Sequence, residues 1–147
     1  MKSALSVLGV LLLASACSTN MSSSGPAVSV KLAQRNASSN IFYFAGPVNL
    51  EYLVQITNPT NEPVTMTSLD LQTVGPGAYF VRAGGTPMNL TVPASSARTY
   101  TIAVWGRARG GYISSTEPVT LRGIAHFKGQ TSGAFTRIFT ENVTPAP

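Results

Sequence analysis

The stretch Val48-Asn-Leu-Glu-Tyr-Leu-Val-Gln-Ile-Thr57 decides the fold class of this chain. Apolar side chains occupy every second position of it, namely Val48, Leu50, Tyr52, Val54 and Ile56. Successive side chains of a β-strand point to opposite faces, whereas one face of a helix repeats every three or four residues. The stretch therefore predicts a strand with one apolar face and one largely polar face.

Similar but shorter runs lie on both sides of this strand, and Gly, Pro, Asn and Ser separate them, as turns require. The strands expected from these runs cover residues 28–32, 48–57, 64–71, 78–82, 100–104, 119–127 and 135–143, and residues 88–92 add an eighth if they pair. The apolar phase shifts near Thr67-Ser68, which predicts a β-bulge. The sequence therefore predicts an all-β, antiparallel sandwich over residues 28–147.

Immunoglobulin-like domains of bacterial envelope proteins contain a strand–turn–strand unit that resembles the segment Tyr52-Leu-Val-Gln-Ile-Thr-Asn-Pro-Thr-Asn-Glu-Pro-Val64. The same segment is similar to the opening of late-embryogenesis-abundant type 2 (water-stress) domains. Their later corner resembles Leu90-Thr-Val-Pro-Ala-Ser-Ser-Ala-Arg-Thr-Tyr-Thr-Ile102. These resemblances imply an immunoglobulin-like β-sandwich of seven to eight strands. They carry over no functional residue, because domains of this fold have many unrelated functions.

The amino-terminal segment has the features of an export signal. Lys2 precedes an apolar stretch over residues 4–14, which is shorter than the ~20 residues that a membrane-spanning helix needs. Ala14-Ser15-Ala16-Cys17 follows and resembles the lipobox of bacterial lipoproteins. An ordinary signal peptide cut after Ala16 also fits this pattern, but it leaves the lone Cys17 unexplained. We therefore expect residues 1–16 to be a lipoprotein signal peptide.

The resemblance to lipoproteins implies that Cys17 carries a diacylglyceryl group on its thiol and an acyl chain on its new amino terminus. Several acyl chains anchor a protein durably, whereas one binds reversibly. Ser18 stands where Asp would signal retention in the inner membrane, so the family rule points to the outer membrane, facing the periplasm. Residues 17–27 are uncharged and Ser-rich, and we expect a flexible tether with a reach of about 15–20 Å.

The composition restricts the partners of the domain. Only 10 % of the residues are charged, and the net charge of +5 falls to +4 once Lys2 leaves with the signal segment. No cluster of Lys and Arg forms a nucleic-acid footprint, so we expect no nucleic acid as a partner. The expected partners are a membrane, through the lipid anchor, and an envelope protein or an anionic lipid or glycan. A single cysteine excludes an intramolecular disulfide.

The residues that could support catalysis are few and scattered. His126 is the only histidine, and its position in the strand pattern places it on the solvent side, with Glu117 as the nearest acid in the sequence. No Gly-x-Ser-x-Gly elbow is present, and the five acids lie on separate segments rather than in a metal-binding spacing. We therefore expect no enzyme, no catalytic residue, no metal and no cofactor.

One segment combines aromatic and basic residues, Trp105-Gly-Arg-Ala-Arg-Gly-Gly-Tyr112, within a loop expected over residues 106–117. The guanidinium group of arginine binds anions through paired hydrogen bonds, and aromatic rings stack on planar or sugar groups. The candidate site for a ligand or partner is therefore Trp105, Arg107, Arg109 and Tyr112. The alternative is a plain hairpin loop whose Trp105 packs against the sheet edge.

These features together favour a membrane-anchored lipoprotein of the bacterial cell envelope with a non-catalytic accessory, structural or binding role. The alternative, from the water-stress resemblance, is a stress-protective domain that shields membranes or proteins. A glycan-binding or carbohydrate-active module is the third possibility.

Overall fold

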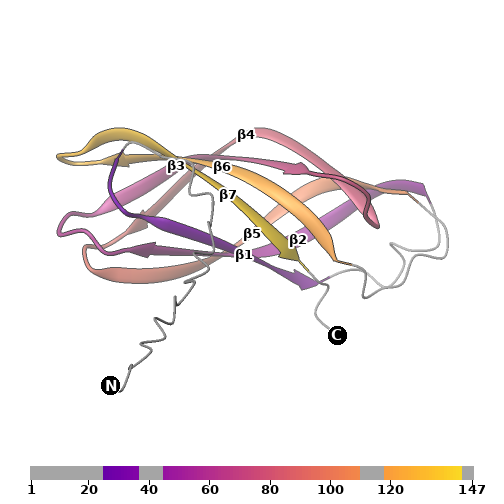
Figure 1. Ribbon diagram of the computed structural model, residues 1–147, viewed down its shortest axis with the longest axis horizontal. Coiled ribbons are helices and arrows are strands. Elements are labelled where there is room, and N and C mark those ends of the chain that lie inside the picture. Colours follow the sequence, from indigo (N-terminus) through magenta and orange to yellow (C-terminus); the bar gives the residue numbers. More distant parts are fainter. Residues whose placement is uncertain (1–24, 37–44, 110–117, 144–147) are drawn as a thin grey trace, which may run out of the picture.

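The computed structural model describes residues 25–36, 45–109 and 118–143, and these ranges form seven antiparallel strands (Figure 1). The strands are β1 (Ser29–Asn36), β2 (Ala45–Asn58), β3 (Val64–Thr73), β4 (Tyr79–Val92), β5 (Ser96–Arg109), β6 (Val119–Gly129) and β7 (Gly133–Val143). The prediction of an all-β, antiparallel fold is confirmed. No helix in the described ranges has the length and apolar character needed to cross a membrane.

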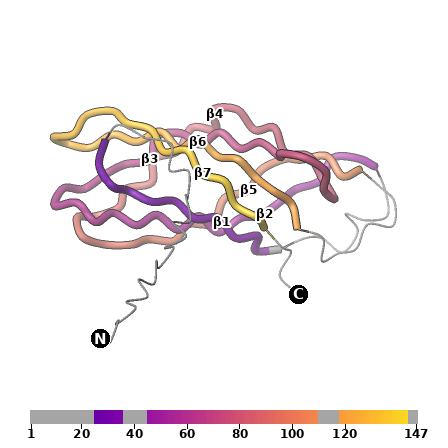
Figure 2. The backbone as a smooth tube through the Cα atoms, in the orientation of Figure 1, coloured from indigo at the N-terminus to yellow at the C-terminus, as the bar shows by residue number. Residues whose placement is uncertain are grey.

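The strands follow the order β1-β2-β5-β4-β3-β6-β7 in one hydrogen-bonded sheet that folds over into two layers. One layer contains β1, β2 and β5, and the other contains β3, β6 and β7. Strand β4 joins the layers, because residues 79–81 pair with β5 and residues 82–92 pair with β3. This order is that of an immunoglobulin-like sandwich. The outermost strands β1 and β7 approach each other and nearly close the sheet (Figure 2).

The apolar face of the deciding strand lies in the core between the layers. Val48 is 6 % exposed, and Leu50, Tyr52, Val54 and Ile56 are completely buried. The core also contains a polar pair, because the hydroxyl of Tyr52 donates to that of Tyr79 at 3.0 Å. Tyr79 in turn donates to Gln34 of β1 at 2.8 Å. Burial raises the pKa of Tyr52 far above its usual value and raises that of Tyr79 to about 12, so both phenols stay neutral.

Two predicted boundaries are wrong, and glycine explains both. Residues 78–82 and 88–92 belong to one strand, β4, because the pair Gly84-Gly85 opposite Asp70 forms a bulge that interrupts the register without ending the strand. Gly85 has a φ of 56°, which suits glycine. Strand β5 continues to Arg109, so no loop begins at residue 106. Gly106 lies inside β5, and glycine is required there because a Cβ would come within 2.7 Å of the Phe80 carbonyl oxygen.

The bulge predicted near Thr67-Ser68 is confirmed. The register of β3 with both of its neighbours shifts between Met66 and Ser68. Met66 and Leu69 are both buried although they are three residues apart, which a regular strand does not allow. The extra residue therefore returns the apolar phase of β3 to the core.

Asn58 ties together two of the turns at one end of the sandwich. Its buried amide nitrogen donates to the carbonyl oxygens of Glu62 at 2.8 Å, Pro93 at 2.9 Å and Val92 at 3.3 Å. Its side-chain oxygen accepts from the backbone N–H and the hydroxyl of Thr60 at 3.1 and 2.6 Å. The turn after β2 and the turn after β4 are both points where the chain changes layers, so one side chain joins the two crossings.

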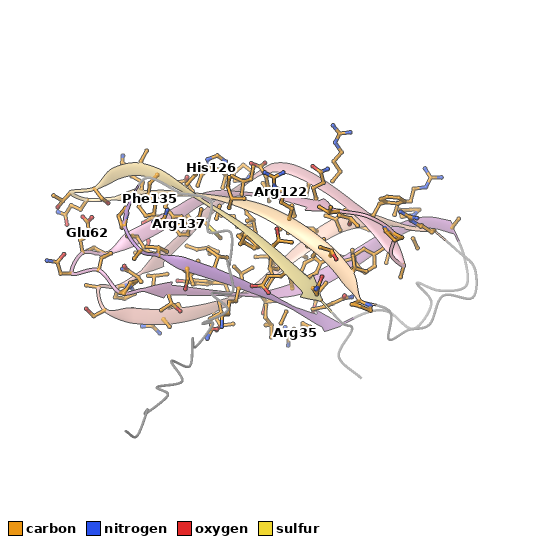
Figure 3. The ribbon with its side chains drawn as sticks, in the orientation of Figure 1. Arg35, Glu62, Arg122, His126, Phe135 and Arg137 are labelled. Atoms are coloured by element: carbon orange, nitrogen blue, oxygen red, sulfur yellow. The ribbon has the colours of Figure 1, made fainter. Side chains whose placement is uncertain are left out.

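Arg137 attaches the start of the described domain to the last strand. Its Nε donates to the carbonyl oxygen of Val28 at 3.0 Å, and its Nη2 donates to that of Gly25 at 2.9 Å. Burial lowers the pKa of this guanidinium, whose plane also lies near the Phe135 ring, 5.5 Å from its centroid. The clasp closes the side of the sandwich between β1 and β7 (Figure 3).

Candidate binding surface

Strand β5 presents three of the four predicted site residues on its outer face. Trp105, Arg107 and Arg109 are exposed, and they alternate with the buried or half-buried residues Val104, Gly106 and Ala108. Trp105 is 70 % exposed, so it does not pack against a sheet edge as the alternative supposed. Tyr112 lies outside the described residues. The three residues therefore project from a regular strand, and the expectation of a loop is corrected.

A fourth residue, which is aromatic, joins this face from the neighbouring strand. Phe80 of β4 is the cross-strand partner of Arg107, and it is 46 % exposed. The guanidinium carbon of Arg109 lies 3.7 Å from the centroid of the Phe80 ring, a cation–π contact worth about 0.5–1 kcal/mol at an exposed site. We name Phe80, Trp105, Arg107 and Arg109 the β5 face. The contact holds the Arg109 side chain against the sheet surface.

The charges on the β5 face are not neutralised within the described part of the chain. The ion pairs found there join Arg35 to Glu51 at 4.0 Å and His126 to Asp70 at 3.1 Å. Neither pair includes Arg107 or Arg109. The face thus offers two guanidinium groups and two exposed rings to a ligand, a combination that suits an anion attached to a ring or sugar.

His126 lies on the outer face of β6, as its place in the strand pattern predicts, but its partner is not the acid nearest in sequence. Its Nε2 lies 3.1 Å from Oδ2 of Asp70, which is on β3, and Glu117 lies outside the described residues. No hydroxyl group in the described ranges hydrogen-bonds to the His126 ring. The pair therefore joins β6 to β3 without a nucleophile bound to the imidazole.

Asp70 has a second partner, the backbone N–H of Gly85 at the bulge of β4. The hydrogen bond from Gly85 and then that from His126 hold the pKa of Asp70 below its usual value. Three strands thus meet at one carboxylate. Sequence reasoning missed this cluster, because Asp70 and His126 are 56 positions apart and no local motif connects them.

A shallow hollow of about 310 Å³ lies beside this cluster on the outer surface of β3, β4 and β6. Its polar lining includes Asp70, Gln72, Arg82 and Arg122. Figure 3 shows Arg122 and His126 on the same side of the molecule, away from Glu62 at one end. Sequence reasoning also missed this hollow, since its residues come from three separate strands. Cys17, the predicted lipidation site, lies outside the described residues.

Comparisons with known proteins support the fold alone. No family model matches the chain, and no curated protein matches it. One similar solved structure is the X-ray structure of the Northeast Structural Genomics Consortium target SoR45, with 14 % identity, a TM-score of 0.50 and coverage of 80 % of this chain and 84 % of that one. Another is the putative ApaA protein from Bordetella pertussis, with 17 % identity, a TM-score of 0.51 and coverage of 84 % and 98 %. The chain thus shares an all-β sandwich fold with these two structures.

Proposed function

We propose that this chain is a lipoprotein of the bacterial cell envelope, anchored through Cys17, whose β-sandwich binds an anionic envelope component without catalysis. The observation that carries the proposal is the run Ala14-Ser15-Ala16-Cys17 after the short apolar stretch at residues 4–14. A lone cysteine directly after a signal cleavage pattern is typical of a lipidation site, and no disulfide partner exists in the chain.

The position of the β5 face relative to the start of β1 supports a binding role. The segment that follows the tether is clasped by Arg137, and β1 begins where Ser29 pairs with Thr57, near the end of β2. Arg107 pairs with Pro47 near the other end of β2. Ten residues of strand separate Pro47 from Thr57, which corresponds to about 33 Å at the usual rise per residue. The face therefore lies at the end of the sandwich opposite the start of β1, the strand that follows the proposed tether.

The proposed ligand of the β5 face is an acidic glycan of the envelope. Guanidinium groups bind carboxylate and phosphate in a bidentate way, and Arg107 and Arg109 have no acid partner among the described residues. The exposed ring of Trp105 favours a glycan over a simple anion, because aromatic rings stack on the apolar faces of sugars. An anionic lipid headgroup would use the arginines but not the ring.

The anchor is tested by replacing Cys17 with Ser and following the protein in its own host. We expect the native chain to incorporate labelled palmitate and to fractionate with the outer membrane. The variant should incorporate no label and should remain as precursor or appear in the soluble fraction. Mass spectrometry of the native amino terminus should show an acylated Cys17. An unmodified cysteine, or a terminus elsewhere, would contradict the proposal.

The binding role is tested by replacing Arg107 and Arg109 together with Ser. The native protein should associate with acidic glycan fractions from the envelope, and the association should weaken with salt, since exposed charges are screened over about 8–10 Å. The double variant should lose the association and keep its melting temperature within a few degrees. The control replaces Lys31 and Arg98, exposed residues near the other end of the same layer, with Ser. Equal loss in the control would show a net-charge effect and refute a defined face.

A further inference from the structure

We propose that the hollow on β3, β4 and β6 is a separate binding site for a small sugar that carries an oxyanion group, either phosphate or carboxylate. The site is independent of the membrane anchor and of the β5 face. Its lining includes Asp70, Gln72, Arg82, Gly84, Arg122 and Ile124.

Two arginines face each other across the hollow because of the strand register. Gln72 of β3 is the cross-strand partner of Arg82 on β4 and also of Arg122 on β6. All three side chains are exposed on the outer surface. Neighbouring strands lie about 4.8 Å apart, so the two arginine Cα atoms are separated by roughly 10 Å, with the Gln72 amide between them. Two side chains of this length can converge on one oxyanion from opposite sides.

The guanidinium groups are available to a ligand. Within the ranges that the structure describes, no carboxylate lies within 4.0 Å of either Arg82 or Arg122. Asp70, the acid beside them, is engaged by the N–H of Gly85 and by His126. The hollow therefore has two fixed positive charges against one negative charge that is already hydrogen-bonded. This excess favours an oxyanion, and the planar guanidinium fork matches phosphate and carboxylate oxygens.

The bulge in β4 makes the space for the rest of the ligand. Gly84 and Gly85 both stand opposite Asp70, so β4 has one extra residue here and its pairing with β3 is interrupted. A Cβ on Gly84 would meet only the Oδ1 of Asp70, at 4.0 Å, which means that the space above Gly84 is open. A volume of about 310 Å³ is at the lower end for small-molecule sites and suits a monosaccharide.

The remaining lining favours a sugar over a bare anion. Each carboxylate oxygen can accept two hydrogen bonds, and the oxygens of Asp70 have one described partner each, so they can also accept from ligand hydroxyl groups. The side chain of Ile124 on β6 adds an apolar wall beside Asp70, its cross-strand partner. A sugar phosphate or a sugar acid fits this lining, with its oxyanion between the arginines, its hydroxyl groups toward Asp70 and its C–H face on Ile124.

The proposal is tested by calorimetry on the full chain purified in a non-ionic detergent, at low salt and neutral pH. The probes are glucose 6-phosphate, glucuronate, inorganic phosphate and glucose. We expect at least one anionic sugar to bind, and the stronger of the two identifies phosphate or carboxylate as the group recognised. Glucose should not bind, and inorganic phosphate should bind more weakly than the preferred sugar. Equal binding of phosphate and the anionic sugars would refute the contribution of Asp70 and the apolar wall.

Two variants locate the binding. Replacing Arg82 and Arg122 together with Gln should weaken it by at least about tenfold, because charge-assisted hydrogen bonds are lost. Gly84→Leu should abolish it by filling the hollow, with both arginines in place. The double replacement of Lys31 and Arg98 with Gln is the charge-matched control and should bind like the native chain. Binding of neither sugar by the native protein, or equal weakening in the control, would overturn the proposal. If Gly84→Leu does not fold, the arginine pair decides alone.

Discussion

Replacing Asn58 with Asp should destabilise the protein far more than its chemical similarity suggests. The Asn58 amide is completely buried, and its nitrogen donates to three carbonyl oxygens, those of Glu62, Val92 and Pro93. An aspartate of the same shape presents an oxygen there, so four acceptors face one another without a proton. A buried acceptor left without its donor costs about 1–3 kcal/mol, and a partly buried one costs less.

The expected cost follows from the burial of each bond. The bond to Val92 is buried, whereas those to Glu62 and Pro93 are partly buried. The amide has two N–H groups, so the three carbonyl oxygens share two donors; counting about 1–3 kcal/mol for one buried bond and about 0.5–1.5 kcal/mol for one partly buried bond, the loss is about 1.5–4.5 kcal/mol. Burial of the new charge adds to it. Because a domain has only about 5–15 kcal/mol of stability, the variant should melt at least about 8 °C lower, or fail to fold at neutral pH.

Urea and thermal unfolding between pH 5 and 8 provide the assay. The buried carboxyl of Asn58→Asp should have a pKa above its unfolded value, so the folded state is favoured when the group is protonated. Part of the lost stability should therefore return as the pH falls toward 5, because the protonated carboxyl can donate to one carbonyl oxygen. Asn61→Asp, an exposed change in the same turn, is the control. If both variants melt at the same temperature, the Asn58 amide does not hold the corner and the reasoning fails.

Three further predictions follow from burial, hydrogen bonding and glycine packing. Val54→Asp places an unpaired charge in the core and should cost several kcal/mol in thermal melts, whereas Gln55→Asp, on the exposed face of the same strand, should be tolerated; equal losses would mean that the strand phase is wrong. Hydrogen bonds from Ser132 and Thr131 lower the pKa of Glu62 below its usual value of 4.5. The stability that these bonds contribute is complete above the usual pKa and is lost as the pH falls through the lowered pKa. Glu62→Gln should therefore flatten the acid limb of a pH–stability curve, and an unchanged limb would exclude Glu62 as its source. Gly123→Ala forces a methyl group against the Phe139 ring and should cost about 1–3 kcal/mol in urea unfolding, whereas Gly84→Ala, with open space, should be nearly neutral.

The sequence was sufficient for every feature that depends on local alternation. The apolar positions from Val48 to Ile56 identify a strand and its buried face, because the side-chain period of a strand is two whatever its partners are. The phase shift near Thr67-Ser68 likewise predicts a bulge, and the structure has one there. The outward direction of His126 follows from the same counting. The lipobox is a local motif too, and its lipidation at Cys17 stays a prediction.

At two positions, glycine led to a wrong prediction of a loop from the local sequence. Gly84 and Gly106 stand in stretches that have the composition of loops, yet both lie inside strands. At residue 84 the glycine pair fits a bulge, and at residue 106 it allows the Phe80 backbone to approach. A sequence does not distinguish a glycine required by a close neighbour from one required by a turn, because the neighbour comes from another strand.

Only the tertiary structure decided which side chains meet. The alternation of apolar and polar residues predicts that Asp70 and His126 point outward. Their contact, however, depends on the register of β3 against β6. The contact of Phe80 with Arg109 likewise depends on three residue pairs between β4 and β5. Shifting a register by one residue would move a whole strand face from core to solvent, so the buried apolar residues select the register for the entire sheet. The register chosen by the buried residues also determines the polar contacts on the outer surface. Those contacts therefore depend on several strands together and cannot be read from one segment of the chain.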